Sequence, residues 1–325
     1  MNVSAAAQRP IPCVFLMGPT ASGKTGLALA LAAAIEAGRT PWAGADLISV
    51  DSAQVYRGMD IGTAKPPVET LQRWPHALID ILDPAESYSA ARFRDDALAL
   101  IAAARAAGRV PLLVGGTGLY YRALEHGLSA LPAADAAVRE RLTTEAEALG
   151  WPALHARLAS FDTASAAKIA PNDPQRILRA LEIHALTGKS RSAHWQEPRS
   201  APLEGPLVKF GLLPPERSAL HAAIAERFRQ MMGAGFLAEV QQLKARGDLQ
   251  AGLPSIRSVG YRQLWEHLEG QCSLSVAVEQ GIAATRQYAK RQVTWLRSET
   301  ALQLLNPGDG NLVFTVLERL VQHDH

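Results

Sequence analysis

The chain has 325 residues, of which 48% are hydrophobic and 20% charged, so it can bury an ordinary core in one large domain or two smaller ones. Its formal net charge of +2 is nearly neutral, so any contact with nucleic acid must come from a local basic surface. Two cysteines exclude a disulfide framework and a cysteine-rich zinc site. No apolar run is long enough to span a bilayer, and Met1 to Pro12 lack the pattern of a secretory leader, so we expect a cytoplasmic protein without a membrane contact.

The predicted core begins with a short apolar strand, Val14 to Met17, and continues through a glycine-rich loop into an Ala/Leu-rich helix over Leu27 to Ala37. The loop fills every fixed position of the phosphate-binding pattern G-x-x-x-x-G-K-[ST] with the residues Gly18, Pro19, Thr20, Ala21, Ser22, Gly23, Lys24 and Thr25. In this strand–loop–helix context the backbone N–H groups point at phosphate oxygens, Lys24 adds positive charge, and the Thr25 hydroxyl is placed to hold Mg²⁺. We therefore predict that the loop binds a phosphate or diphosphate group. The motif does not show which molecule carries this group.

A second apolar strand, Asp46 to Val50, ends at the carboxylate of Asp51. A helix joins it to the first strand, so we predict that the two strands lie parallel in one sheet. Ligands bind beyond the carboxyl ends of such strands, so Asp51 and the phosphate loop should open onto the same crevice. Asp51 could cap the strand, hold Mg²⁺ or take part in the chemistry, and we favour a direct chemical role. The long loop 52–66 that follows is expected to be functional.

Further strands complete the predicted sheet. A third strand is expected at Ala77 to Leu82, and a helix over Ser89 to Ala107 leads into a fourth strand, Val110 to Val114. The fourth strand is apolar throughout, as expected for a parallel strand covered on both faces. It runs into Gly115-Gly116-Thr117-Gly118, and a glycine cluster at a strand end marks a place where the backbone approaches a ligand. A strand over Val208 to Leu213 later returns the chain to the sheet.

Between residues 127 and 206 the pattern changes to amphipathic helical segments without a recognisable strand. The segments are 135–149, 153–158 and 174–186, followed by a polar linker over 188–205. Asp173 and Pro174 mark the start of the last helix as its N-cap and first helical residue. We predict an α/β fold with a P-loop NTPase-like parallel sheet core flanked by helices. Its core domain is assigned to residues 1–126 and 207–325, and an all-helical insertion domain to residues 127–206.

The remainder of the chain is predicted to be helical. The helices are Glu216 to Met232, Phe236 to Arg246, Ser258 to Leu268 and Ser273 to Arg297. On the last of them Arg286, Lys290 and Arg297 recur at helical spacing on one face. Such a face is either a solvated surface or, beside a phosphate loop, a contact for a polyanion, and the sequence leaves both interpretations open.

Three function classes fit these residues. The first is a P-loop kinase or NTPase that uses Asp51 as a magnesium ligand or base. The second is a transferase that holds a diphosphate leaving group in the loop and binds an RNA acceptor through its basic helices. The third is a nucleotide-binding module without catalysis. Composition does not separate them.

Several blocks of the sequence closely resemble the bacterial tRNA dimethylallyltransferase family, in the family's order and over nearly the whole chain. The blocks are the loop Asp51 to Pro66, Gly115 to Tyr120, Asn172 to Glu182, Ser258 to Gln263, and Arg286 to Gln292. Two features depart from the pattern. The turn Arg39 to Ala45 is longer than usual, which a surface loop tolerates. The C-terminal zinc finger of eukaryotic relatives is missing, in keeping with the two cysteines.

The resemblance implies a reaction: transfer of a dimethylallyl group from dimethylallyl diphosphate to N6 of adenosine 37, in tRNAs that read codons beginning with U. The products are N6-(dimethylallyl)adenosine and diphosphate, with Mg²⁺ as cofactor. An adenylate isopentenyltransferase, which acts on a free nucleotide, remains the nearest alternative. We expect a monomer whose insertion domain grips the anticodon stem-loop.

The resemblance also implies roles for individual residues. Asp51 is expected to accept the proton from the adenine amine, and Arg227 to join the phosphate loop and the Mg²⁺ on Thr25 in holding the diphosphate. The expected RNA contacts are Asp51, Ser52, Ala53, Gln54, Thr117, Arg139, Gln175, Arg176, Ile177, Leu178, Arg179, Arg257, Ser258, Val259, Gly260, Tyr261 and Arg262.

Overall fold

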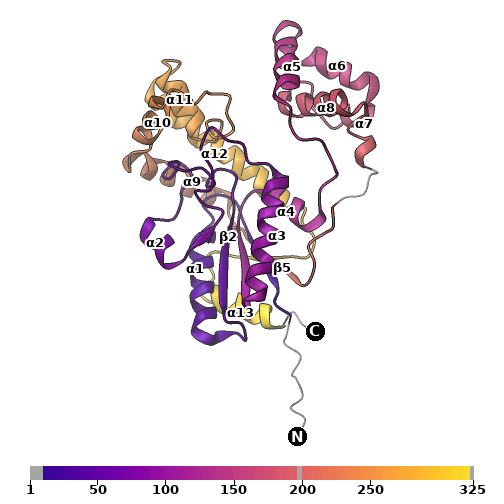
Figure 1. Ribbon diagram of the computed structural model, residues 1–325. Coiled ribbons are helices and arrows are strands. Elements are labelled where there is room, and N and C mark those ends of the chain that lie inside the picture. Colours follow the sequence, from indigo (N-terminus) through magenta and orange to yellow (C-terminus); the bar gives the residue numbers. More distant parts are fainter. Residues whose placement is uncertain (1–9, 196–199, 323–325) are drawn as a thin grey trace. The chain divides into compact units, whose positions relative to one another are not determined.

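The computed structural model describes residues 10–195 and 200–322. Within these residues, six strands form one parallel sheet in the order β3-β2-β4-β1-β5-β6 (Figure 1). The strands are β1 (Cys13–Met17), β2 (Gly44–Val50), β3 (His76–Ala77), β4 (Arg109–Gly115), β5 (Leu207–Leu212) and β6 (Leu302–Leu305). The predicted α/β class with a parallel sheet core is confirmed.

Helices flank this sheet and extend beyond one end of its strands (Figure 1). Those outside the helical insertion are α1 (Lys24–Ala34), α2 (Val68–Arg73), α3 (Ala90–Ala106), α4 (Gly118–His126), α9 (Arg217–Gly233), α10 (Phe236–Ala245), α11 (Tyr261–Leu268), α12 (Leu274–Leu296) and α13 (Leu312–Gln322). Figure 1 shows α9, α10 and α11 gathered beyond one end of the strands, with α13 toward the other end. None of the helices in the described ranges has the length and apolar character needed to cross a membrane.

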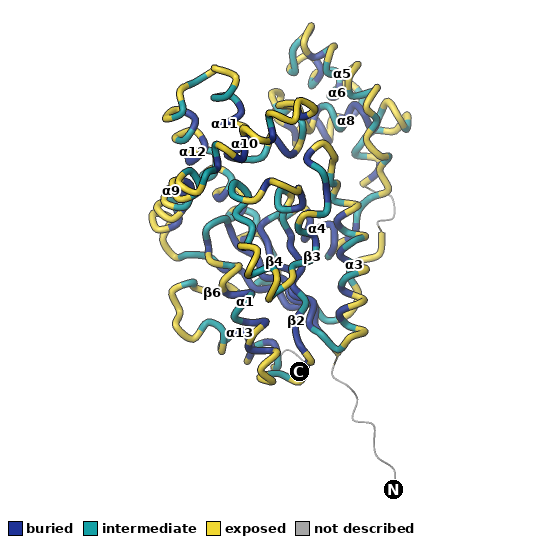
Figure 2. The backbone as a smooth tube through the Cα atoms, turned by 60° about the vertical axis from the view of Figure 1, so that its left-hand side comes forward, coloured by how far each residue is buried: buried dark blue, intermediate teal, exposed yellow. Residues whose placement is uncertain are grey.

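The inner strands β1 and β4 are buried on both faces, which explains their continuous apolar sequence (Figure 2). Successive side chains of β1 point to opposite sides of the sheet. Val14 and Leu16 belong to the core that α1 and α13 cover. On the other side, the Phe15 ring packs against Tyr121 of α4, with ring centroids 4.8 Å apart. Both faces are therefore shielded from water, as a parallel sheet requires.

The strand register brings three chain segments to one edge of the sheet. Gly115 of β4 pairs with Met17 of β1 on one side and with Val50 of β2 on the other. The residues that follow these three positions are the phosphate loop, Asp51 and the Gly116 turn. The two strands predicted to be parallel are so, and β4 lies between them, which places the glycine cluster between the phosphate loop and Asp51.

The third strand is the clearest error in the predicted sheet. The expected strand at Ala77 to Leu82 is reduced to β3, which ends at Ala77. Leu78 and Asp80 have φ angles of 67° and 57°, and this left-handed backbone interrupts an extended strand. Leu82 instead forms an isolated parallel bridge with Tyr56 of the loop 52–66, which is called the functional loop below.

Other elements differ in extent. The helix α4, the strand β6 and the helix α13 were not predicted; β6 extends the sheet by pairing with β5. The first helix begins at Lys24 rather than Leu27 and runs into a π-helical turn, Ile35–Arg39. The predicted helices of the C-terminal part begin and end within a few residues of α9, α10, α11 and α12.

The chain divides into two compact units, one made of Met1–Leu124 with Glu204–His325 and the other of Glu125–Leu203. The second unit begins two residues before the start of the expected segment 127–206 and ends three residues before the end of that segment. It contains the helices α5 (Ala136–Leu149), α6 (Trp151–Phe161), α7 (Thr163–Ala166), α8 (Pro174–Thr187) and the 3-10 turn Ala193–Trp195. The side chains of Asp173 and Asp135 cap α8 and α5 by accepting from backbone N–H groups. Residues 196–199 of the predicted linker lie outside the described residues.

Candidate active site

A cavity of about 470 Å³ lies at the carboxyl edge of the sheet, where the phosphate loop, Asp51 and Gly116 meet. Five parts of the chain line it: the phosphate loop with the start of α1, the segment after β2, the end of β4 with Gly116, α9 and α12. The lining residues with polar side chains are Thr20, Ser22, Lys24, Thr25, Asp51, Gln54, Thr63, Glu226, Arg227, Gln230, Tyr288 and Gln292. Of the predicted loop residues, Gly18 and Pro19 lie outside this lining.

The phosphate loop has the backbone that its glycines predict. Gly23 has a φ of 87° and immediately precedes α1, so the free N–H groups of the first helical turn face the cavity end of the loop. Gly18 packs so closely that a Cβ atom there would lie 2.7 Å from the carbonyl oxygen of Leu212. The Lys24 ammonium donates to the carbonyl oxygen of Pro19 over 2.7 Å. The loop is therefore a tight turn around the lysine.

Lys24 and Arg227 share the cavity with the carboxylate of Asp51. Burial, reinforced by the neighbouring Arg227 guanidinium, lowers the pKa of Lys24 to about 7, and the charge of Asp51 acts in the opposite direction. Burial also lowers the pKa of Arg227, again against the effect of Asp51. The Arg227 guanidinium donates a hydrogen bond to the Thr20 hydroxyl of the phosphate loop. An anion bound here would relieve the mutual repulsion of the two cations.

Asp51 is held in one orientation by the loop that follows it. One carboxylate oxygen, Oδ1, accepts from the backbone N–H groups of Ala53 and Gln54 over 2.8 and 3.2 Å. The Gln54 side chain is held in turn: its Oε1 accepts from the Ser49 hydroxyl over 3.0 Å. Its Nε2 donates to the carbonyl of Thr63 over 3.3 Å, which joins the two ends of the functional loop. The arrangement orients a carboxylate toward a cavity that also holds positive charge.

Tyr288 and Gln292 of α12 are site residues that were not predicted individually. Gln292 accepts from the Thr20 N–H over 2.9 Å and donates to the Gly116 carbonyl over 3.0 Å, so it joins the phosphate loop to the turn after β4. Burial, with the charge of Asp51 next in importance, raises the pKa of Tyr288 to about 12, while the neighbouring side chains of Thr117 and Gln292 oppose the shift. Thr117, an expected RNA contact, therefore lies beside the cavity. The signal that could have found Tyr288 and Gln292 is their position on the family-like block, four residues apart on one helix face.

The basic residues of the same helix have different surroundings. Lys290 and Arg297 are exposed, whereas the Arg286 side chain is half-buried, and its Nε lacks a hydrogen-bond partner within the described residues. The exposed pair forms a positively charged surface on α12.

The expected RNA contacts before and within α11 are only partly accessible. Arg257 and Arg262 are exposed, and Ser258 and Val259 are half-buried. Gly260 is buried and Tyr261 is fully buried, so the Tyr261 side chain is not accessible to a ligand in this structure, and its assignment as an RNA contact stays a prediction. Its hydroxyl donates to the carboxylate of Glu239 over 2.5 Å. Near Asp51, Ser52 is exposed and Ala53 half-buried, and neither belongs to the cavity lining.

The helical unit contains the remaining expected RNA contacts. Gln175 and Arg176 are exposed near the start of α8, and Leu178 is half-buried. Ile177 is fully buried in the core of this unit, so its side chain is not accessible to a ligand in this structure, and its assignment as an RNA contact stays a prediction.

Arg139 and Arg179 of the same unit are both held by the buried carboxylate of Glu182. The Arg139 Nε lies 2.8 Å from Oε1 and the Arg179 Nη1 lies 2.6 Å from Oε2. The Asp135 N–H donates to the same carboxylate over 2.9 Å. Burial opposes ionisation of Glu182, but these three donors outweigh it and lower its pKa. Both arginines remain partly exposed, so Glu182 orients their charge at the surface of the unit.

Comparison with known proteins identifies the family of this chain. The sequence model of the IPP transferase family matches residues 54–299. A tRNA dimethylallyltransferase of Alkalilimnicola ehrlichii is 58% identical over 288 residues, which cover 89% of this chain and 88% of that protein.

Several solved structures are also similar to this chain. The full-length tRNA isopentenylpyrophosphate transferase of Bacillus halodurans is 36% identical, with a TM-score of 0.67 over 97% of this chain and 99% of that one. A tRNA delta(2)-isopentenylpyrophosphate transferase of Staphylococcus epidermidis is 34% identical, with a TM-score of 0.62 over 96% of this chain and 98% of that one. A eukaryotic dimethylallyltransferase acting on tRNA shares the fold at 24% identity, with a TM-score of 0.74 over 97% of this chain and 79% of that one. The chain therefore belongs to the IPP transferase family.

Proposed function

We propose that this protein transfers a dimethylallyl group from dimethylallyl diphosphate to the exocyclic N6 of adenosine 37 in tRNAs that read codons beginning with U. One observation carries the proposal: a single cavity holds the phosphate loop, the cations Lys24 and Arg227, and the carboxylate of Asp51. A diphosphate leaving group needs the phosphate loop and the two cations to hold it, and an amine nucleophile needs the carboxylate as a base. The name of the 58% identical relative, a tRNA dimethylallyltransferase, supports the same reaction.

The phosphate loop would hold the diphosphate rather than hydrolyse a nucleotide. The backbone N–H groups at the start of α1, together with Lys24 and Arg227, offer donors and positive charge to the departing oxygens. Charge builds up on those oxygens as the allylic carbon–oxygen bond breaks. Donors already in place stabilise that charge without reorganisation in the transition state.

Asp51 would act as the base. The N6 lone pair forms a bond to C1 of the dimethylallyl group while the C1–oxygen bond breaks, and its electron pair leaves with diphosphate. The N6 proton passes to the Asp51 carboxylate. An adenine amine is a weak nucleophile because its lone pair is delocalised, and a positioned base contributes roughly 10²–10⁴-fold. The bonds from Ala53 and Gln54 to Oδ1 fix the orientation that this step needs.

The donors of the cavity fit Mg²⁺. This ion is commonly held by few protein oxygens together with substrate phosphates. Within residues 10–195 and 200–322, no group of three or more His, Cys, Asp or Glu side chains could hold a metal without such help. The exposed Thr25 hydroxyl at the start of α1 would hold the ion beside the diphosphate. The bound ion would neutralise negative charge on the leaving group.

The acceptor adenosine must leave its stack to reach Asp51, and RNA-binding enzymes commonly act on bases splayed out of a loop. We assign the grip on the anticodon stem-loop to the helical unit, where Arg176 is exposed and Glu182 orients Arg139 and Arg179. Contacts of this kind fix the register of the RNA on the protein. A nearly neutral chain can supply them through local basic surfaces.

The test is to incubate the protein with Mg²⁺, radiolabelled dimethylallyl diphosphate and either unmodified tRNA or AMP. We expect label in tRNA alone. Label in AMP would instead identify an adenylate isopentenyltransferase, and ATP turnover without labelling of either acceptor would identify a kinase or NTPase.

A further inference from the structure

The loop that follows Asp51 is fixed by a buried carboxylate that lies outside the cavity. Glu239 of α10 has a side chain that is nearly fully buried, and it does not line the cavity. Its Oε2 accepts from the backbone N–H groups of Asp60 and Ile61 over 2.9 and 2.7 Å. Its Oε1 accepts from the N–H of Gly62 over 3.1 Å. Three consecutive backbone donors of the functional loop therefore converge on one side chain, 177 or more positions away in the sequence.

Tyr261 completes this arrangement from α11. Its hydroxyl donates to Oε1 of Glu239 over 2.5 Å. Burial, followed by the charge of Glu239, raises the pKa of Tyr261 above its ordinary value, so the phenol stays a donor. Glu239 thus accepts four hydrogen bonds, which satisfies both oxygens of a buried carboxylate. Burying a carboxylate with fewer hydrogen bonds would destabilise the fold. The buried charge of Glu239 therefore requires its four donors.

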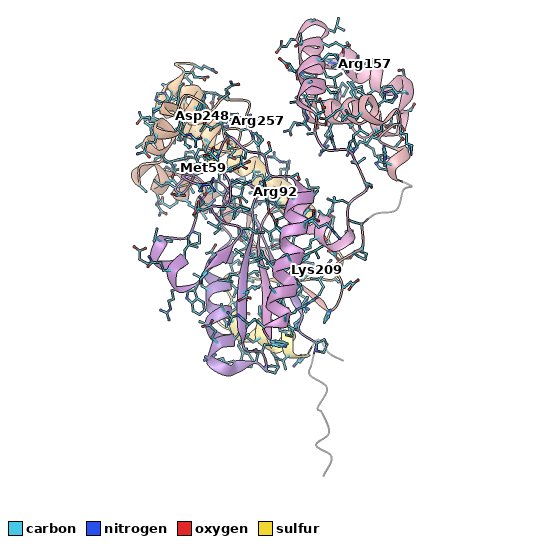
Figure 3. All side chains as sticks on the ribbon, viewed as in Figure 1. Met59, Arg92, Arg157, Lys209, Asp248 and Arg257 are labelled. Atoms are coloured by element: carbon cyan, nitrogen blue, oxygen red, sulfur yellow. The ribbon has the colours of Figure 1, made fainter. Side chains whose placement is uncertain are left out.

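Apolar side chains surround the contact between Glu239 and the functional loop. Met59 belongs to a core cluster that includes Phe236 and Tyr261, and Figure 3 shows Met59 beside the helices α9 and α10. A side chain at Gly62 would overlap with the rings of Phe236 and Tyr261, so the loop backbone must pass closely under them. Glu239 therefore lies within a tightly packed contact that leaves the loop little room to shift.

The constraint reaches the cavity through the residues that follow. Thr63 and Ala64 line the cavity, directly after the Asp60–Gly62 segment that Glu239 holds. Their carbonyl oxygens accept from Nε2 of Gln54 over 3.3 and 3.4 Å, and Gln54 also lines the cavity. The N–H of Gln54 donates to Asp51 over 3.2 Å. A short chain of contacts thus connects Glu239 to the orientation of the proposed base.

We infer that Glu239, with Tyr261 as its hydrogen-bond donor, is a positioning residue that holds the cavity wall formed by Gln54, Thr63 and Ala64 for the acceptor adenosine. This inference rests on the proposed function. The phosphate loop and Arg227 do not contact Glu239 through any hydrogen bond found in the described residues. The effect of Glu239 is therefore on the acceptor side of the reaction and not on the diphosphate.

The test compares Glu239→Gln and Tyr261→Phe with a matched control, Glu269→Gln. Glu269 directly follows α11 and is exposed, and its carboxylate accepts from Trp265 and not from the functional loop. An amide at position 239 has one acceptor oxygen and would turn its NH₂ group toward backbone donors. Because a misplacement of about 1 Å can cost about 10²-fold, we expect kcat/KM for tRNA to fall by about 10- to 10²-fold. The Kd for diphosphate with Mg²⁺ should change by no more than about twofold.

The double variant Glu239→Gln/Tyr261→Phe separates positioning from direct RNA contact. If Tyr261 acts through Glu239, the double variant should be no worse than Glu239→Gln alone. Multiplicative effects would show that Tyr261 acts independently and would overturn the pairing. Equal losses of diphosphate affinity and of kcat/KM for tRNA, or activity equal to that of Glu269→Gln, would overturn the inference. If Glu239→Gln does not fold, Tyr261→Phe is judged against the same two criteria.

Hydrogen exchange separates this inference from the proposed function. The amides of residues 60–62 should exchange faster in Glu239→Gln than in Glu269→Gln, whatever the reaction of the enzyme. A wild-type protein that labels no tRNA would refute the proposed function. Unchanged exchange at residues 60–62 in Glu239→Gln would refute the anchoring by Glu239, even if tRNA is labelled normally.

Discussion

The Lys24 ammonium donates a hydrogen bond to the carbonyl oxygen of Pro19 over 2.7 Å, so the lysine of the phosphate loop folds back onto its own loop. Burial and the nearby Arg227 lower the pKa of Lys24 to about 7. A bound diphosphate favours the charged ammonium and should raise this pKa again. Lys24 therefore links anion binding to proton uptake.

The sign of that linkage is testable. Above about pH 7 the free protein carries mostly neutral Lys24, and binding must recruit a proton, so diphosphate affinity should fall as the pH rises from that value. Calorimetry at about pH 8 in buffers of different ionisation enthalpy should show more proton uptake for the wild type than for Lys24→Arg, because arginine stays charged. Protonation of diphosphate itself contributes equally to both proteins. Equal uptake in the two would contradict the shifted pKa.

The amide of Gln292 should stabilise the junction between the phosphate loop and the turn after β4. In Gln292→Ala the Thr20 N–H and the Gly116 carbonyl both lose their partner. We expect the free energy of unfolding to fall by about 1–3 kcal/mol. Denaturant unfolding measures this change, with Gln287→Ala, an exposed glutamine of the same helix, as control. Equal stability of the two variants would show that the buried amide adds nothing.

Glu182 should determine the stability of the helical unit and the orientation of its arginines. Glu182→Gln leaves Arg139 and Arg179 without their shared countercharge, and we expect a loss of about 1–3 kcal/mol together with weaker tRNA binding. Hydrogen exchange over residues 125–203 tests the first effect and a tRNA-binding titration the second. Glu140→Gln, an exposed residue of α5, is the control. The same protection in both variants would contradict the structural role of Glu182.

Much of the sheet was predictable because parallel strands are buried on both faces and therefore read as continuous apolar runs. The strands around Val14, Leu112 and Val208 have this pattern. The third strand was mispredicted because an apolar run does not reveal the left-handed backbone of Leu78 and Asp80. The edge strand β6 was missed because it is short and only partly buried.

The residues of the candidate site were also predictable only in part. The phosphate loop and Asp51 were predictable because each directly follows a strand that ends at the same sheet edge. Gln292 and Glu239 were not, because their partners are backbone groups far away in the sequence. Tyr261 and Ile177 were assigned to RNA by resemblance, whereas in the structure both side chains are buried in cores. Sequence similarity identifies such positions, but it does not distinguish a residue that contacts RNA from a buried residue that supports the fold.

The most direct test of the account is a single-turnover transfer from radiolabelled dimethylallyl diphosphate to an anticodon stem-loop RNA, with wild type and Asp51→Asn. Asparagine keeps an oxygen that can accept from Ala53 and Gln54, but it is not a base. We expect Asp51→Asn to bind both substrates with near wild-type affinity and to transfer the label roughly 10²–10⁴-fold more slowly. Transfer by Asp51→Asn at the wild-type rate would show that Asp51 is not the base and would contradict the proposed mechanism.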